Sequence, residues 1–478
     1  MAEILKRTKA LAVNPLKVSQ PVGASLAFLG LRSAIPMLHG SQGCTAFGKV
    51  FFVRHFREPI PLQTTAMDHI STVMGADANV IEGLKTICEK NAPEIIGLPT
   101  TGLSETQGTD IKRLVKRFRE EHPQFDHIAV VPVNAPDDTG SLESGFALAV
   151  EAIIDHMVPM RVPMRVPKSA LAGRRQNRSV AGRRHKQVNV LAASMLTPGD
   201  IETIKEWIEA FGLRPVVLPD LGDSLDGHLT DREFSPLTVG GTPKSEIEAL
   251  GEAVATLVIG RSLCRAADLL KERTGVPDVR FDHLMGLDAC DAFTAALAEI
   301  ADQPVPEKIE RQRAQLQDAM VDTHFMAGFA RLALALDPDH LLAFGEFFSG
   351  MGAEIVAAVA PNVAKSGAAV LNDVPCATVQ IGDIEDLERA AKLGNAQLLI
   401  SNSHAAQSAG RLNLPLLRAG FPQYDLVGGY ARAWVGYRGA RQALFDLANL
   451  ILGQHHDIPA YRSIYRRPAE ADAGLVRH

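Results

Sequence analysis

Short apolar runs alternate with glycine-rich turns and longer amphipathic segments along most of the chain. Residues 94–98 and 127–133 are apolar runs of strand length, and each is followed by a turn. After these turns, residues 109–119 and 145–156 place apolar side chains at helical spacing. Apolar runs without polar alternation are typical of strands buried on both faces, so the pattern predicts βα units with parallel strands.

The same pattern restarts twice. At the first restart, Thr197–Asp200 has the composition of an N-cap for a helix over 201–211, which Gly212 ends. At the second, Asp337–Pro338 opens a helix that Gly352 closes. The further predicted strands are residues 188–191, 215–218, 255–259, 331–336, 355–359, 398–401 and 414–418.

Three rounds of this unit predict an α/β fold of three Rossmann-like domains, each a parallel sheet flanked by helices. We expect an N-terminal α/β domain at 1–158, a basic linker insert at 159–186, a second domain at 187–304, and a third at 305–478 that ends in a helical segment. Neither a Gly-x-Gly-x-x-Gly fingerprint nor a Walker A run is present, so a nucleotide site has no support.

The predicted insert differs from the rest in composition. It overlaps a tandem Val-Pro-Met-Arg (158–161 and 162–165) and a repeated Ala-Gly-Arg-Arg (172–175 and 181–184), and residues 160–186 contain no acidic residue. Such an Arg-rich stretch predicts a solvated linker rather than packed structure. A basic patch that contacts an acidic partner or a cluster intermediate is the alternative.

Composition narrows the class of protein. The 478 residues are 46% hydrophobic with a net charge of −6, which gives no general case for nucleic-acid binding. No apolar stretch of membrane-spanning length occurs, and the first residues lack the pattern of a signal peptide. The five cysteines are scattered and odd in number, which predicts a reducing, cytoplasmic setting rather than a disulfide framework.

One cysteine stands out by its context. Cys44 follows Gly43 and precedes an apolar helical pattern that begins at Phe47, so we expect its sulfur at a helix N-terminus. Unpaired N–H groups and the helix dipole favour a thiolate there, the form that binds iron or attacks a bond. The next cysteine is Cys88, so the chain has no local four-cysteine site. If Cys44 binds a metal, ligands from outside the chain complete the site; a plain thiol at a glycine turn is the alternative.

Several motifs along the chain, one of which contains Cys44, resemble those of one known family. They occur in a fixed order and are Asn14–Pro21, His39–Cys44, Arg54–Pro59, Thr100–Glu105, Asp322–Phe325 and Pro415–Asp425. Together they resemble the β-type chains of the nitrogenase component 1 family. The resemblance covers nearly the whole chain apart from the basic insert.

The departures from that family indicate which kind of member this is. In the catalytic β chain, three cysteines serve the eight-iron P-cluster, in contexts similar to those of Ser19, Cys44 and Gly102 here, and only Cys44 keeps its thiol. A serine oxygen is a harder ligand that suits cluster iron poorly, and glycine has no side chain. The resemblance is therefore closest to the members that assemble the iron–molybdenum cofactor, and it implies no independent enzymatic activity.

That resemblance implies a set of partners and cofactors. Cys44 would be the metal ligand that this chain gives to a [4Fe-4S] cluster shared with a NifE-type α chain, in an α2β2 heterotetramer. Gly40 and Gly43 would let the backbone approach the cluster and direct N–H groups at its sulfides. The iron–molybdenum cofactor precursor would be held mainly by the partner, where molybdenum and homocitrate are inserted with transient help from the nitrogenase iron protein.

Three other functions stay open at this point. The nearest is the β chain of a catalytic nitrogenase, including vanadium-type relatives, and the second is a subunit of dark-operative protochlorophyllide reductase. The third belongs to another class: an iron-free α/β ligand-binding protein in which Cys44 senses redox state.

Overall fold

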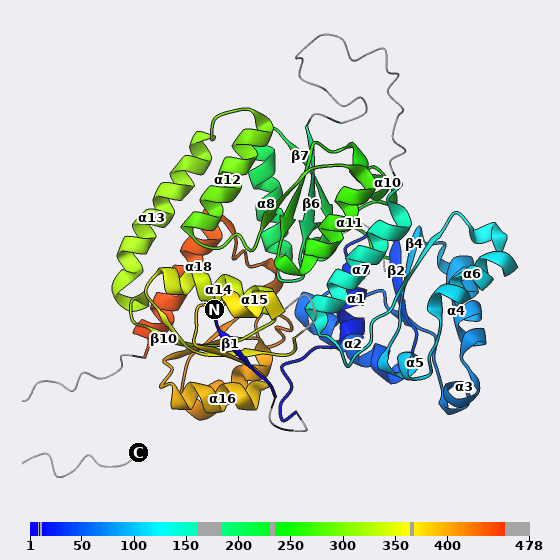
Figure 1. Cartoon of the computed structure of the whole chain (residues 1–478), viewed down its shortest axis with the longest axis horizontal. Helices are drawn as coiled ribbons and strands as arrows, with labels where there is room; N and C mark the ends of the chain where they lie inside the picture. Colours follow the sequence, from blue (N-terminus) through cyan, green and yellow to red (C-terminus); the bar gives the residue numbers. More distant parts are fainter. Residues whose placement is uncertain are drawn as a thin grey trace, which may run out of the picture.

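The computed structural model describes residues 1–7, 9, 12–160, 184, 186–229, 235–363 and 368–454. Three parallel sheets form three lobes, and α1 and α7 pack together between the first lobe and the other two (Figure 1). The expected fold class, parallel α/β sheets flanked by helices, is confirmed. The domain boundaries stay predictions, and nearly all of the insert predicted at 159–186 lies outside the described residues.

The first sheet has the order β3-β2-β4-β5. Its strands are β2 (Ala34–Leu38), β3 (Gln63–Thr64), β4 (Ile95–Pro99) and β5 (Ala129–Val133). The helices of this part are α1 (Gln20–Leu29), α2 (Gln42–Phe56), α3 (His69–Met74), α4 (Asp77–Asn91), α5 (Gly102–Thr106), α6 (Ile111–Glu121) and α7 (Leu142–Met157). Every residue of α1 is buried, because α1 packs on α7 between this lobe and the other two.

The second sheet has the order β7-β6-β8-β9. Its strands are β6 (Gln187–Ala192), β7 (Arg214–Leu218), β8 (Ala255–Ile259) and β9 (Asp278–Phe281), and its helices are α8 (Pro198–Ala210), α9 (Leu221–Ser224), α10 (Lys244–Glu248), α11 (Cys264–Thr274) and α12 (Leu287–Ala301). The predicted cap of α8 is confirmed, because the Thr197 side chain accepts a hydrogen bond from the Asp200 backbone N–H and the Asp200 carboxylate accepts one from the Thr197 backbone N–H.

The third sheet has the order β1-β12-β11-β10-β13-β14. Its strands are β1 (Glu3–Leu5), β10 (Arg331–Ala335), β11 (Glu354–Ala360), β12 (Thr378–Ile381), β13 (Leu398–Ser401) and β14 (Leu416–Arg418), and its helices are α13 (Glu307–Ala327), α14 (Pro338–Gly350), α15 (Ala368–Asp373), α16 (Ile384–Leu393), α17 (Ala406–Leu412) and α18 (Gly436–Leu452). No described helix is long and apolar enough to cross a membrane.

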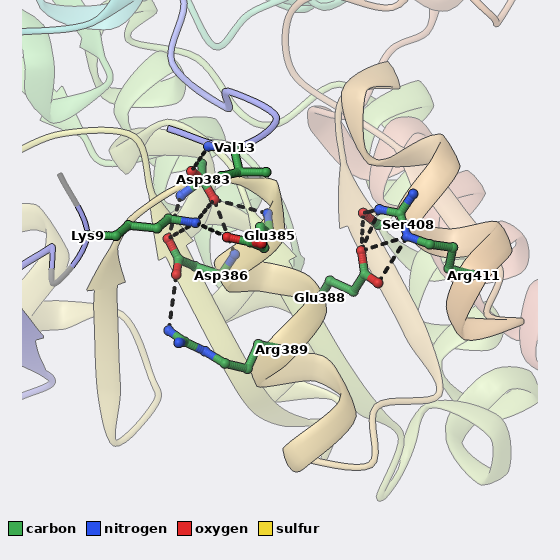
Figure 2. Close-up of polar contacts among 9 residues, drawn as sticks. All are labelled: Lys9, Val13, Asp383, Glu385, Asp386, Glu388, Arg389, Ser408 and Arg411. Atoms are coloured by element: carbon green, nitrogen blue, oxygen red, sulfur yellow. Dashed lines mark hydrogen bonds and ion pairs between the residues drawn. The ribbon is translucent and has the colours of Figure 1, made fainter. Parts of the chain in front are cut away.

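The chain begins in the third sheet and then crosses to the first. After β1, the Lys9 ammonium lies 2.7 Å from the Asp383 carboxylate and 2.6 Å from that of Glu385, with Asp386 at 3.4 Å (Figure 2). The Val13 backbone N–H donates to the other Asp383 oxygen at 2.8 Å. These contacts tie the N-terminal segment to the start of α16.

We expect Lys9→Met to loosen this segment. Asp383 and Asp386 are almost fully buried and would lose their shared cation, so the free energy of unfolding should fall by about 1–3 kcal/mol. Urea unfolding of the full chain measures this. The exposed Lys6→Met change is the control, and an equal loss in both variants would contradict the role of the Lys9 contacts.

Candidate functional site

Cys44 lies in the first turn of α2, as the sequence predicts. The helix begins at Gln42 after the N-cap Ser41, whose side chain does not cap the helix. Instead, Ser41 Oγ donates to Cys44 Sγ at 3.4 Å. The first backbone N–H groups of α2 therefore keep their positive partial charge beside an exposed thiol, an arrangement that favours an anionic ligand.

The other four cysteines differ from Cys44 in exposure. Cys88 and Cys290 are buried, and Cys264 and Cys376 are half-buried. Burial raises the pKa of Cys88 and of Cys376 to about 11, and it also raises the pKa values of Cys264 and Cys290. Burial therefore keeps these four as thiols and leaves Cys44 as the one cysteine open to a ligand.

Ser19 and Gly102 both lie beside Asp137. The backbone N–H of Gln20, which follows Ser19, donates to Asp137 Oδ1 at 3.3 Å, and a Cβ added to Gly102 would lie 3.5 Å from Asp137 Cβ. The next residue back, Thr101, packs on Gly40, three residues before Gly43. Ser19 and Gly102 thus border Asp137, and Gly102 follows the residue that packs on the turn before Cys44.

Gly40 and Gly43 have different surroundings. A Cβ on Gly40 would lie 2.5 Å from Thr101 Oγ1, and the Gly40 N–H already donates to Thr65 Oγ1 at 3.2 Å. Packing thus accounts for glycine at position 40, and its contact with a cluster stays a prediction. Gly43 is exposed, and an added Cβ would meet nothing nearer than Ser41 Oγ at 4.0 Å.

We expect the two glycines to respond differently to alanine. Gly40→Ala should lower the free energy of unfolding by about 1–3 kcal/mol, because its Cβ clashes with Thr101. Gly43→Ala should leave it unchanged or raise it by up to about 1 kcal/mol, because the site is an open helix position. Thermal unfolding of both variants checks this, and equal losses would contradict it. Loss of iron from a stable Gly43→Ala complex would then support a contact between Gly43 and the cluster.

His39 precedes the glycines and is fully buried. Its Nδ1 lies 2.9 Å from Thr65 Oγ1, and its Nε2 has no hydrogen-bond partner among the described residues. Burial lowers the pKa of His39 to about 4, so the ring is neutral near pH 7. His39 therefore helps to hold the turn before Cys44 and carries no charge there.

The motif Pro415–Asp425 supports the C-terminal half of α2. Phe421 packs against Phe52 and His55, and the backbone N–H of Gln423 donates to His55 Nδ1 at 2.9 Å. The Arg54 guanidinium lies over the Tyr424 ring at 4.3 Å from its centroid. These side chains act structurally here, because they fix α2 against the third lobe.

Two exposed apolar surfaces lie in the same lobe as Cys44. The apolar face of α2 consists of Phe47, Val50 and Val53, of which Phe47 is 72% exposed. The apolar face of α3 consists of Ile70, Val73 and Met74, each at least 72% exposed. Exposed apolar groups of this size typically mark protein contacts. The sequence analysis predicted neither surface. The signal for the second was three apolar residues at 70, 73 and 74 on a helix capped by Asp68.

The described residues contain no group of three or more His, Cys, Asp or Glu side chains arranged to hold a metal ion. An exposed thiol with one serine donor, open helix N–H groups and an adjacent apolar face fits one corner of an iron–sulfur cluster. Any further thiolates for such a cluster must come from another chain.

Comparisons with known proteins agree with the sequence motifs. Residues 19–452 match the family described as nitrogenase component 1 type oxidoreductase. The chain is 45% identical to the nitrogenase iron-molybdenum cofactor biosynthesis protein NifN of Klebsiella pneumoniae over 98% of both chains, and 45% identical to that of a Nostoc species over 95% and 96%. Among solved structures, it resembles a chain of nitrogenase Cp1 at pH 6.5 with a TM-score of 0.84, at 30% identity over 98% of both chains. The chain belongs to the nitrogenase component 1 family.

Proposed function

We propose that this chain is a scaffold subunit on which the nitrogenase iron–molybdenum cofactor is matured. The similarity to NifN proteins over nearly the full length supports that role. The observation that carries the proposal is the exposed thiol of Cys44. Ser19 and Gly102 stand in the two sequence contexts that resemble those of the other P-cluster cysteines of the catalytic β chain. One thiolate is too few for half of an eight-iron cluster and is the number expected from one side of a shared four-iron cluster.

In this proposal, Cys44 gives one ligand to a [4Fe-4S] cluster at the boundary with a NifE-type α chain, and the partner gives three. When bound, the cluster supplies one-electron transfer. The Ser41 hydroxyl and the first N–H groups of α2 stabilise the negative charge at the sulfur. The apolar face of α2 lies against the partner and keeps water from the boundary.

The finer features of assembly follow from the same proposal. Two αβ pairs form an α2β2 heterotetramer, and the cofactor precursor is a cargo held mainly by the α chain, where molybdenum and homocitrate are added. The chain has no independent activity and works in the cytoplasm, which agrees with its scattered, unpaired cysteines.

The nitrogenase iron protein is the transient partner in this proposal. The exposed apolar face of α3 supports a docking role. Gln107, in the loop after α5, holds α3 in place. The Gln107 side-chain amide donates to the backbone oxygens of Ser71 and Thr72 at 2.8 and 2.9 Å. A protein that docks on α3 would thus contact the same lobe that carries Cys44.

One alternative has a specific observation in its favour. The likeness to a nitrogenase structure at 30% identity fits a catalytic β chain as well as a scaffold. Ser19 and Gly102 argue against it, because a β chain needs thiols at both positions to hold an eight-iron cluster.

Anaerobic co-purification with the α chain, followed by iron counting and electron paramagnetic resonance, tests the proposal. A shared four-iron cluster predicts about four boundary iron atoms per αβ pair. An eight-iron signature would favour the catalytic β chain, and pigment binding with reduction would favour the protochlorophyllide enzyme. A colourless complex with every plausible partner would favour the iron-free redox sensor.

A further inference from the structure

Three carboxyl side chains meet where the three lobes come together. Glu143 is in the first turn of α7, just after β5 of the first sheet, and Asp337 and Asp339 open α14 just after β10 of the third. Ser262 reaches the same place from the turn after β8 of the second sheet. The carboxyl ends of one strand from each sheet therefore converge on this acidic junction, made of Glu143, Asp337 and Asp339.

Hydrogen bonds cross between the lobes at the acidic junction. The backbone N–H of Asp339 donates to Glu143 Oε2 at 2.9 Å, and Ser141 Oγ donates to Asp337 Oδ1 at 3.1 Å. From the second lobe, Ser262 donates to Asp339 Oδ2 through its hydroxyl at 2.6 Å and its backbone N–H at 3.2 Å. Each lobe is thus bonded to a carboxyl group of this cluster.

No cation among the described residues forms an ion pair with these carboxyl groups. The charged group nearest in sequence to Ser262 is Arg261, whose guanidinium is bound by Asp282 at 2.7 Å and by Asp373. The remaining titratable groups that face the cluster are the carboxylate of Asp282, the Cys264 thiol and the buried His340 ring. Burial lowers the pKa of His340 to about 4, so that ring is neutral near pH 7.

Three adjacent negative charges, two of them buried and that of Asp337 half-buried, are unstable without a cation. Burial raises the pKa values of Asp337 and Asp339 to about 6, and it raises the pKa of Glu143 well above its usual value. Asp339 Oδ1 has no hydrogen-bond partner in the described part of the chain. The same part contains no side-chain group arranged to hold a metal ion, so protons are left to balance the charge.

We propose that protons shared among Glu143, Asp337 and Asp339 latch the three lobes together, and that loss of these protons opens the junction. Opening exposes the carboxyl groups to water, where their proton affinity falls. The opened state therefore binds fewer protons than the closed state, and opening increases as the pH rises. The latch is independent of Cys44 and of any cluster.

Hydrogen exchange on the assembled complex from pH 4 to 9, corrected for the intrinsic rate at each pH, tests the latch, because Asp337 and Asp339 release their protons on opening below about pH 6. The backbone N–H groups of Asp339 and Ser262 report directly, because both donate across the junction. Their opening constant should rise with pH, by up to tenfold per pH unit for each proton released.

Glu143→Gln removes one ionisable group and keeps an oxygen that accepts from the Asp339 N–H. The slope of the logarithm of the opening constant against pH should fall by up to one unit, because one fewer proton is released. The opening constant at pH 9 should fall at least tenfold. Glu272→Gln, an exposed carboxylate on α11, is the control and should leave the rise unchanged. Should Glu143→Gln fail to assemble, Asp337→Asn makes the same test from α14 and keeps the acceptor for Ser141. An opening constant that is flat from pH 4 to 9, or as steep in the neutral variant as in the wild type, would overturn the proposal.

Discussion

Cys44→Ala, co-expressed with its α-type partner, should lose about one four-iron cluster, or about four iron atoms, per αβ pair. Cys44 is the one exposed cysteine of the five, and an iron–sulfur cluster that loses one of four thiolates at a subunit boundary becomes open to water. The fold should survive, because alanine suits the first turn of α2 and nothing packs over the exposed side chain. Iron analysis and electron paramagnetic resonance measure the loss.

The matched control is Cys264→Ala. This cysteine is half-buried on α11, in the second lobe, and its pKa is raised by burial. Its removal should leave the iron content unchanged. Full iron and an unaltered signal in the Cys44→Ala complex would remove Cys44 from the site and, with it, the basis of the proposed function.

Phe47→Asp should separate this chain from its α-type partner. Phe47 is one turn from Cys44 on the apolar face of α2, and its side chain is 72% exposed in the single chain. A carboxylate forced into that boundary would be buried without a cation, at a cost of about 3 kcal/mol or more, which corresponds to at least about a 100-fold weaker complex. The boundary cluster should be lost together with the partner. Anaerobic size-exclusion chromatography and iron counting measure both effects.

Leu393→Asp controls for the chemical change itself. Leu393 is as exposed as Phe47, but it ends α16 in the third lobe, away from Cys44. That variant should keep both the partner and the iron. If Phe47→Asp assembled with unchanged affinity, the face of α2 would not be the contact surface, and the route by which Cys44 shares a cluster would have to be sought elsewhere.

The strands β4, β8, β10 and β13 were predictable because they are buried along nearly their whole length and are short apolar runs. The partly exposed strands β9 and β12 contain charged or polar residues and were missed. The strand β2 was missed since Pro36 stands in its middle and resembles a turn signal, although Pro36 pairs with Gly97 at the centre of the first sheet. The strand β1 was missed because three residues carry no periodicity, and it joins a sheet whose other strands lie more than 300 residues later.

The site was predictable where its chemistry is local in sequence. The glycine, the thiol and the helix start all occur within Ser41–Phe47, so the position of Cys44 followed from the residues around it. The contacts that join distant segments did not follow. The packing of Thr101 on Gly40 requires glycine at position 40, and the Asp339 N–H donates to Glu143, 196 residues earlier in the chain. Local composition gives no signal for either contact.

Selenocysteine placed at position 44, followed by selenium X-ray absorption of the αβ complex, asks whether this atom touches iron. If the chain shares a cluster with its partner, the spectrum will show iron bonded to selenium in the complex and none in the chain alone. A complex that carries iron elsewhere but shows only carbon and light atoms around that selenium would contradict the account.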